Sequence, residues 1–231
     1  MDERVHDRVP FCVRVQFRNA SSLLIAYSVN LSRGGVFLET DAPVEVGSEV
    51  TLQLEVARAG PVLLSGRVSW RRERPDRDGP VGIGVEFEDM VDTLGELIDS
   101  LVTQFAGITV LVLCHDAKAR ATLARQLRSI MATAEVVGAT DARVAESLLD
   151  EEIDLAVLDA DADPDSALHV LTAAQSLFSP VPAIVLAGSD EMRQRARAGG
   201  AYEVVSNPPP LGELQTAVMR ALGKPSSVKT R

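Results

Sequence analysis

The sequence has few cysteines and no long hydrophobic run, and both shortages limit what the protein can be. Cys12 and Cys114 are the only two cysteines in 231 residues, and their wide separation matches no metal-binding spacing. The apolar run 108–114 is far too short to cross a bilayer. The start, 1–8, lacks the apolar core of a signal peptide. We therefore expect a cytoplasmic protein.

Positive charge is also scarce. Acidic residues number 33 and basic residues 23, which gives a formal net charge of −10 and argues against nucleic acid or an anionic membrane as a partner. Only 3 of the basic residues are lysine, so arginine, which suits forked recognition of phosphate and guanine, dominates. The 46% of hydrophobic residues is enough for packed cores and excludes wholesale disorder.

The hydrophobic pattern changes near residue 105 and predicts two domains. Residues 1–105 contain short segments in which apolar and polar residues alternate, as in strands with one buried face. The expected strands are Phe11–Phe17, Leu23–Leu31, Val36–Glu39, Val50–Val56, Leu63–Arg71 and Val81–Phe87. Six short strands separated by turns predict an N-terminal six-stranded antiparallel β-barrel.

Helical spacing begins at Asp92 and extends to Phe105, with apolar residues such as Ile98 and Leu101 on one stripe. This helix could cap the barrel, bridge the domains or form a dimer interface. Beyond it, the apolar runs 109–113, 155–158 and 183–186 alternate with helical stretches such as 117–131. This order predicts an α/β doubly wound parallel sheet over residues 106–223, followed by a tail at 224–231.

Two short motifs in residues 1–105 gain meaning from their combination. Arg4 and Arg8 form an Arg-x-x-x-Arg pair before the first strand, a spacing that an arginine-rich chain also shows elsewhere. The segment Asn30-Leu31-Ser32-Arg33-Gly34-Gly35 lies between two expected strands, and its composition also suits a simple turn. Asn30 follows Arg8 by 22 residues. This order resembles the PilZ domain over residues 4–105.

The PilZ resemblance implies a six-stranded barrel that binds the bacterial second messenger cyclic di-GMP. Arg4 and Arg8 would then contact guanine edges and phosphates, for which arginine is chemically suited. Asn30 and Ser32 would contact the other guanine or the ligand backbone, while Gly34 and Gly35 would leave space for close approach. Asn30 stands where the family more often has aspartate, so an amide replaces a carboxylate that accepts two bonds.

Residues 107–223 resemble the receiver domain of response regulators. The strand 154–159 matches the one that ends in the phosphoacceptor aspartate, which places Asp159 at that position. The acidic pair that holds Mg²⁺ in receivers is replaced by Cys114 and His115, and Asp116 comes one position late. Ala187 stands for the usual hydroxyl residue, and Asn207 stands for the usual lysine. We therefore expect a pseudo-receiver that is not phosphorylated and holds no metal.

These resemblances predict a non-enzymatic signalling effector. The barrel would sense cyclic di-GMP, and the pseudo-receiver would pass on the state by contact with a protein partner or a second copy. The alternative is a ligand-independent adaptor in which both domains serve as docking surfaces. Catalysis is not expected, because no nucleophile–base or metal constellation is present.

Overall fold

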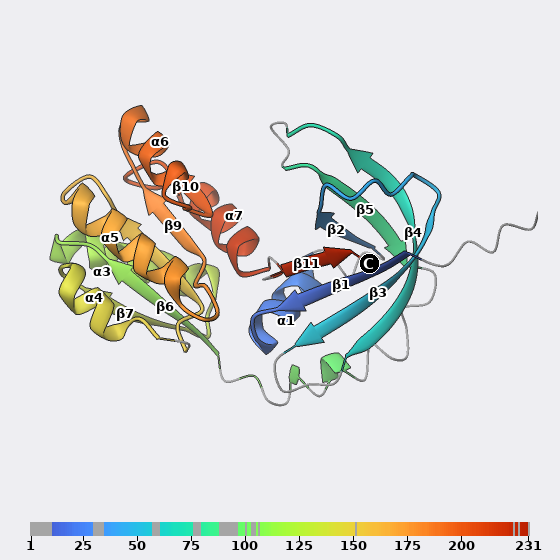
Figure 1. Cartoon of the computed structure of the whole chain (residues 1–231). Coiled ribbons are helices and arrows are strands. Elements are labelled where there is room, and N and C mark those ends of the chain that lie inside the picture. The colour runs from blue at the N-terminus through green and yellow to red at the C-terminus, as the bar shows by residue number, and fades with distance from the viewer. Residues whose placement is uncertain are drawn as a thin grey trace, which may run out of the picture. The chain divides into compact units, whose positions relative to one another are not determined.

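A computed structural model describes residues 11–29, 35–56, 61–75, 80–87, 97–99, 101–102, 105, 107–150, 152–223, 225 and 227–230. The chain divides into two compact units (Figure 1). The first domain comprises Met1–Gln104 together with Pro225–Arg231, and the second domain comprises Phe105–Lys224. In the described part of the chain, no helix is both long and apolar enough to cross a membrane.

The first domain contains a curled six-stranded sheet. Its strands are β1 (Phe11–Phe17), β2 (Gly35–Glu39), β3 (Glu49–Val56), β4 (Val62–Arg72), β5 (Gly82–Phe87) and β11 (Ser227–Thr230), in the order β11-β1-β3-β4-β5-β2. The number of strands is the predicted one, but only β1 to β5 are predicted strands, and β11 is the sixth. The sheet is mixed rather than purely antiparallel, because β1 and β3 pair in parallel.

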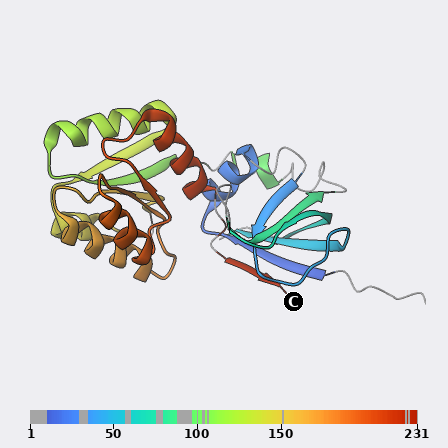
Figure 2. The ribbon, with the colours of Figure 1, turned by 90° about the horizontal axis from the view of Figure 1, so that it is seen from above.

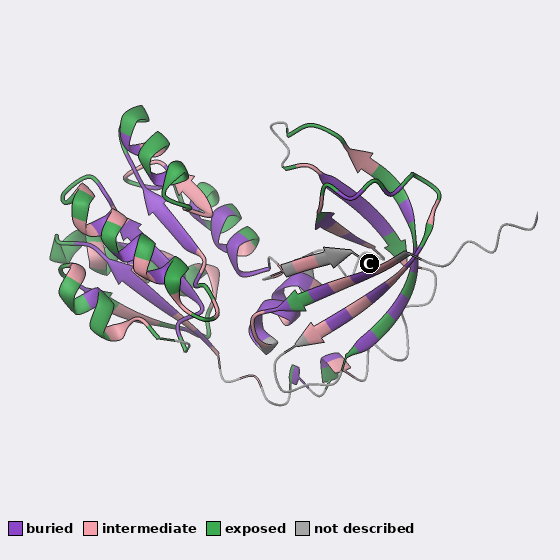
Figure 3. Ribbon diagram, in the orientation of Figure 1, coloured by how far each residue is buried: buried purple, intermediate pink, exposed green. Residues whose placement is uncertain are grey.

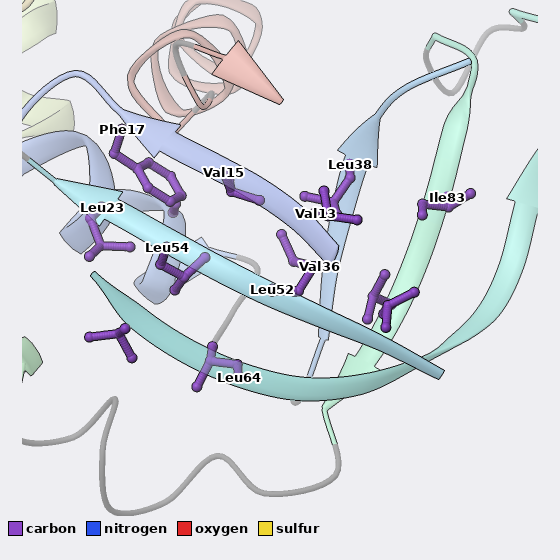
Figure 4. Packing of buried hydrophobic residues seen from close by; sticks show 14 of the residues in the cluster. Val13, Val15, Phe17, Leu23, Val36, Leu38, Leu52, Leu54, Leu64 and Ile83 are labelled. Carbon is purple, nitrogen blue, oxygen red and sulfur yellow. The ribbon is translucent and has the colours of Figure 1, made fainter. Parts of the chain in front are cut away.

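The alternation seen in the sequence builds the core of this domain. Along β4, buried and exposed residues alternate from Val62 to Ser69 (Figure 3). Side chains such as Val15, Leu52 and Leu64 point into the interior of the curled sheet and belong to one buried cluster (Figure 4). Burial of each such side chain contributes roughly 1.5–3 kcal/mol, so this inner face is what holds the sheet together.

The strand expected at Leu23–Leu31 is wrong, because Ala20–Val29 forms helix α1. Asn19 explains the difference, since its Oδ1 accepts hydrogen bonds from the backbone N–H and the hydroxyl of Ser22, both at 2.9 Å. A side-chain acceptor at this position satisfies a free N–H of the first helical turn. Leu23 and Ala26 then pack into the core of the sheet.

The expectation of a tail at 224–231 is also wrong, because Ser227–Thr230 forms strand β11. It pairs antiparallel with β1, from Val13↔Thr230 to Gln16↔Ser227. Half-buried Val228 packs against the core of the first domain. A strand of four residues is too short to produce a recognisable period in the sequence.

Residues 97–99 and 101–102 are helical, in agreement with the expected helix. Ile98 and Leu101 are buried in the core cluster of the first domain, whereas Val102 is 59% exposed. Of the three roles considered for this segment, packing on its own sheet is the one that these contacts support.

The second domain is a parallel five-stranded sheet with helices on both faces. The strands are β6 (Ile108–Leu113), β7 (Ala134–Ala139), β8 (Leu155–Asp159), β9 (Ala183–Leu186) and β10 (Glu203–Val205), in the order β10-β9-β8-β6-β7. The helices are α3 (Ala117–Ile130), α4 (Ala142–Leu148), α5 (Pro164–Ser176), α6 (Asp190–Ala198) and α7 (Leu211–Leu222). Helices α3 and α7 lie on one face of the sheet (Figure 2). The strand order is the flavodoxin-like one, which confirms the doubly wound prediction.

We expect Asn19→Ala to destabilise the protein by about 1 kcal/mol, because the first turn of α1 loses its cap. Chemical denaturation monitored by circular dichroism measures this change. Asn19→Asp, which keeps an acceptor oxygen, serves as the control and should unfold close to the unaltered protein. Equal stability of all three proteins would contradict the capping role.

Candidate functional site

Each domain has one region that could form a functional site. In the first domain, three neighbouring strands support an aromatic stack on the outer face of the sheet. Phe37 of β2 lies opposite Gly84 of β5, which lies opposite Trp70 of β4. The two rings are stacked, with centroids 5.3 Å apart and planes 8° apart. The guanidinium carbon of Arg72 lies 5.3 Å from each ring centroid.

Two glycines make room for this stack. A Cβ atom on Gly84 would lie 2.1 Å from Nε1 of Trp70, and one on Gly82 would lie 2.5 Å from Cζ of Phe37. The rings therefore lie directly over the backbone of β5. Trp70 is 43% exposed, so part of the aromatic surface faces solvent. A cation beside stacked rings is a surface suited to a planar, electron-rich ligand.

Gly35 is the one expected ligand-binding residue that lies within the described structure. It is the first residue of β2 and pairs with Glu86, and a Cβ atom would lie 2.6 Å from the carbonyl oxygen of Val85. The backbone of β5 therefore leaves no room for a side chain at position 35, so the structure alone requires glycine there. The other expected residues lie outside the described residues: Arg4, Arg8, Asn30, Ser32 and Gly34.

In the second domain, Asp159 ends strand β8 at the carboxyl edge of the sheet. Its carboxylate already has several donors: Asn207 Nδ2 lies 2.9 Å from Oδ1, the N–H of Asp161 lies 3.2 Å from Oδ1, and Cys114 Sγ lies 3.3 Å from Oδ2. The residues in the magnesium and lysine positions of a receiver thus contact Asp159 directly. They do so as neutral donors and supply no countercharge.

Asn207 also bonds a second carboxylate. Its Nδ2 lies 3.0 Å from Oδ2 of Asp161, whose two oxygens accept from the N–H of Gly188 at 2.9 and 3.1 Å. One amide nitrogen thus bridges two aspartates, with one proton for each. Asp161 was not among the candidate residues of the sequence. Its hydrogen bonds to Gly188, which follows β9, and to Asn207, which follows β10, depend on tertiary structure and cannot be read from the local sequence.

Two further residues that were compared with receiver positions, Asp116 and Ala187, do not contact Asp159 through a described hydrogen bond. Asp116, one position late, caps α3 by accepting from the N–H of Ala119 at 2.7 Å. Ala187 is fully buried. Among the described residues, no three His, Cys, Asp or Glu side chains gather as a possible metal site.

The environment of Cys114 opposes ionisation. Burial, followed by the hydrogen bond to Asp159 and the negative charge of that carboxylate, raises the pKa of the Cys114 thiol from 9.0 to about 11. The nucleophilic form of cysteine is the thiolate, so this thiol is chemically inert near neutral pH. Its role here is that of a hydrogen-bond donor.

The curled mixed sheet and the parallel α/β sheet define a protein of two domains. Residues 2–104 match the model of the PilZ domain family. The resemblance noted in the sequence is therefore confirmed. PilZ domains are binding modules of cyclic di-GMP signalling.

The second domain is similar to solved receiver domains. The Vibrio cholerae chemotaxis protein CheY4 is 23% identical, with 50% of this chain and 99% of that one covered and a TM-score of 0.44. The receiver domain of a DNA-binding response regulator from Colwellia psychrerythraea is 19% identical, with 48% and 94% covered and a TM-score of 0.44. A comparison with curated proteins gives no match. The receiver-like fold is carried by the strand order of this domain itself.

We expect a thiol-alkylating reagent to modify Cys114 only as the pH approaches 11, because thiolate forms only near the raised pKa. Intact mass measured on a Cys12→Ser variant follows Cys114 alone. In Cys12→Ser combined with Asp159→Asn, the carboxylate that raises the pKa is lost, so modification should begin at lower pH. Rapid modification of Cys114 near neutral pH would contradict this description.

Proposed function

We propose that the protein is a bacterial, cytoplasmic, non-enzymatic effector of cyclic di-GMP. The first domain binds the nucleotide, and the second domain is a pseudo-receiver that passes on the bound state by protein–protein contact. The observation that carries this proposal is the PilZ match over residues 2–104, a segment that contains Arg4, Arg8 and the motif Asn30–Gly35.

The chemistry of the ligand suits the residues of the motif. Cyclic di-GMP carries two phosphates and two guanines, and guanine presents O6 and N7 acceptors that match an arginine fork. Arg4 and Arg8 supply two such forks. Asn30 and Ser32 supply neutral donors and acceptors for the second guanine or the ligand backbone.

The outer face of the first domain adds support from described residues. Gly35 ends the motif and begins β2, and Phe37 follows two residues later on the same face, since Val36 between them is buried. The stack of Phe37 and Trp70 beside Arg72 therefore begins directly after the motif. An exposed aromatic surface with a neighbouring guanidinium suits a planar base.

We expect Arg8→Ala to weaken cyclic di-GMP binding by about 1.5–3 kcal/mol, or about tenfold to hundredfold, because a charge-assisted hydrogen bond is lost. Isothermal titration of the full chain measures the affinity. Trp70 is the only tryptophan, so its fluorescence offers an independent readout of binding.

Arg128→Ala is the matched control, since Arg128 is an exposed arginine at the end of α3 in the second domain. It should bind the nucleotide like the unaltered protein. Equal affinity of Arg8→Ala and the unaltered chain would remove Arg8 from the site. Absence of binding by the unaltered chain would favour the adaptor alternative, in which both domains are docking surfaces only.

The pseudo-receiver assignment rests on the surroundings of Asp159. Phosphorylation of a receiver aspartate requires a divalent cation held by hard oxygen ligands, and a thiol does not provide one. Here Cys114 and Asn207 contact the carboxylate with neutral donors. No cationic side chain stands in the lysine position to balance phosphoryl charge.

We expect the intact mass of the protein to stay unchanged after incubation with a small phosphodonor and Mg²⁺, because Asp159 lacks the cation-binding neighbours that the reaction needs. A receiver protein of known competence, treated in parallel, verifies the donor. A phosphate adduct on the unaltered chain that disappears in Asp159→Asn would overturn the pseudo-receiver assignment.

A further inference from the structure

The chain connects the two domains twice, and the second connection leads into strand β11 of the first domain. The chain leaves the first domain after β5 and its helical segment, forms the whole second domain, and returns with Ser227–Thr230 to pair with β1. The second domain is therefore an insertion within the sheet of the first. Its last helix, α7, is separated from β11 by only four residues, 223–226.

The pairing of β11 with β1 is the shortest ladder in the first domain. It joins four residue pairs, whereas the ladder between β1 and β3 joins seven and the one between β2 and β5 joins five. Its described side-chain anchor is Val228, which is half-buried against the core. Within the first domain, it is therefore the pairing with the fewest residue pairs to break.

Strand β1 is also the continuation of the arginine motif. Only Val9 and Pro10 separate Arg8 from Phe11, where β1 begins. The start of β1 therefore fixes one end of the segment that contains Arg4 and Arg8, so movement of β1 also moves that end. Pairing on the free edge of β1 restricts its motion, since each added ladder bond fixes backbone that would otherwise fluctuate.

On the side of the second domain, the connection to β11 begins at α7, and α7 is hydrogen-bonded to the segment that contains Asn207. Ser206 donates its backbone N–H to Oε1 of Glu213 on α7 at 3.1 Å, and its hydroxyl donates to the same carboxylate. The side-chain amide of the next residue, Asn207, donates hydrogen bonds to Asp159 and Asp161. Helix α7 buries Leu214 and Val218 in the domain and ends at Leu222, and the N–H of the next residue, Gly223, donates to the carbonyl of Met219.

We propose that β11 couples the two domains: its pairing with β1 sets the affinity of the nucleotide motif, and the second domain acts on this pairing through α7. The proposal rests on the cyclic di-GMP binding proposed above. A chain advances at most about 3.5 Å per residue, so the four residues between α7 and β11 limit how far these two elements can separate. A rearrangement around Asn207 that moves α7 therefore pulls on β11, and binding of the nucleotide reciprocally stabilises the ladder.

The first test releases β11 directly. Val228→Asp places a carboxylate against the apolar core, so peptides covering 11–17 should exchange amide hydrogen faster and cyclic di-GMP should bind about fivefold or more weakly. Val228→Ile keeps the apolar contact, and Leu63→Asp places the same charge on an exposed position of β4, 61% exposed. Both controls should bind like the unaltered chain. In that chain, the nucleotide should slow exchange in peptides covering 227–230.

The second test keeps β11 intact and lengthens the connection, which guards against a poorly folded Val228→Asp. Asn207→Ala should change the affinity for cyclic di-GMP about fivefold or more in the native chain. The same substitution should have no effect when a Gly-Ser-Gly-Ser-Gly segment is inserted after Gly223, because the added slack interrupts the pull on β11.

Four outcomes overturn the coupling. Unchanged affinity in a folded Val228→Asp with faster exchange in 11–17 overturns it while the proposed function stands. An equal effect of Asn207→Ala with both connections, or no effect with the native connection, does the same. Failure of the unaltered chain to bind cyclic di-GMP removes the proposed function and the coupling together.

Discussion

Strand β1 needs hydrogen-bond partners along both edges, and the way the chain meets this requirement determines its organisation. One edge pairs in parallel with β3 over its full length, and the other pairs with β11 from the far end of the sequence. A strand edge left open is a site for unwanted pairing with other chains. Because β11 closes this edge, the second domain is an insertion in the first, and the first sheet is completed by residues that follow the second domain.

The period of two was sufficient to predict the strands that line the core. Phe11–Phe17, for example, was predicted with the bounds that β1 has. The segment beginning at Leu23 was misjudged because its apolar residues fit either a strand or a buried helix, as they do in short apolar runs generally. The decision between the two comes from Asn19, whose side chain caps α1. Strand β11 owes its existence to a partner more than 200 residues away in sequence, which no local pattern encodes.

The sequence was enough to predict where candidate residues lie in the fold, but it was not enough to predict which side chains surround them. Asp159 could be placed at the end of a buried strand, since consecutive parallel strands end at the same edge. That Cys114 and Asn207 both turn toward its carboxylate follows from the register of β6, β8 and β10, which only the folded sheet defines. The stack of Phe37 on Trp70 has the same origin, because it depends on Gly84 lying between them on β5.

The substitutions around Asp159 form a consistent set when charge and hydrogen bonds are counted together. Asp159 and Asp161 both accept a hydrogen bond from the side-chain amide of Asn207, so two carboxylates share one donor nitrogen. This nitrogen provides one proton for each carboxylate, and the N–H of Gly188 and the thiol of Cys114 satisfy further lone pairs. Burial and Asp159 keep that thiol protonated and so preserve it as a donor. The described donors to both carboxylates are thus uncharged groups of the chain itself.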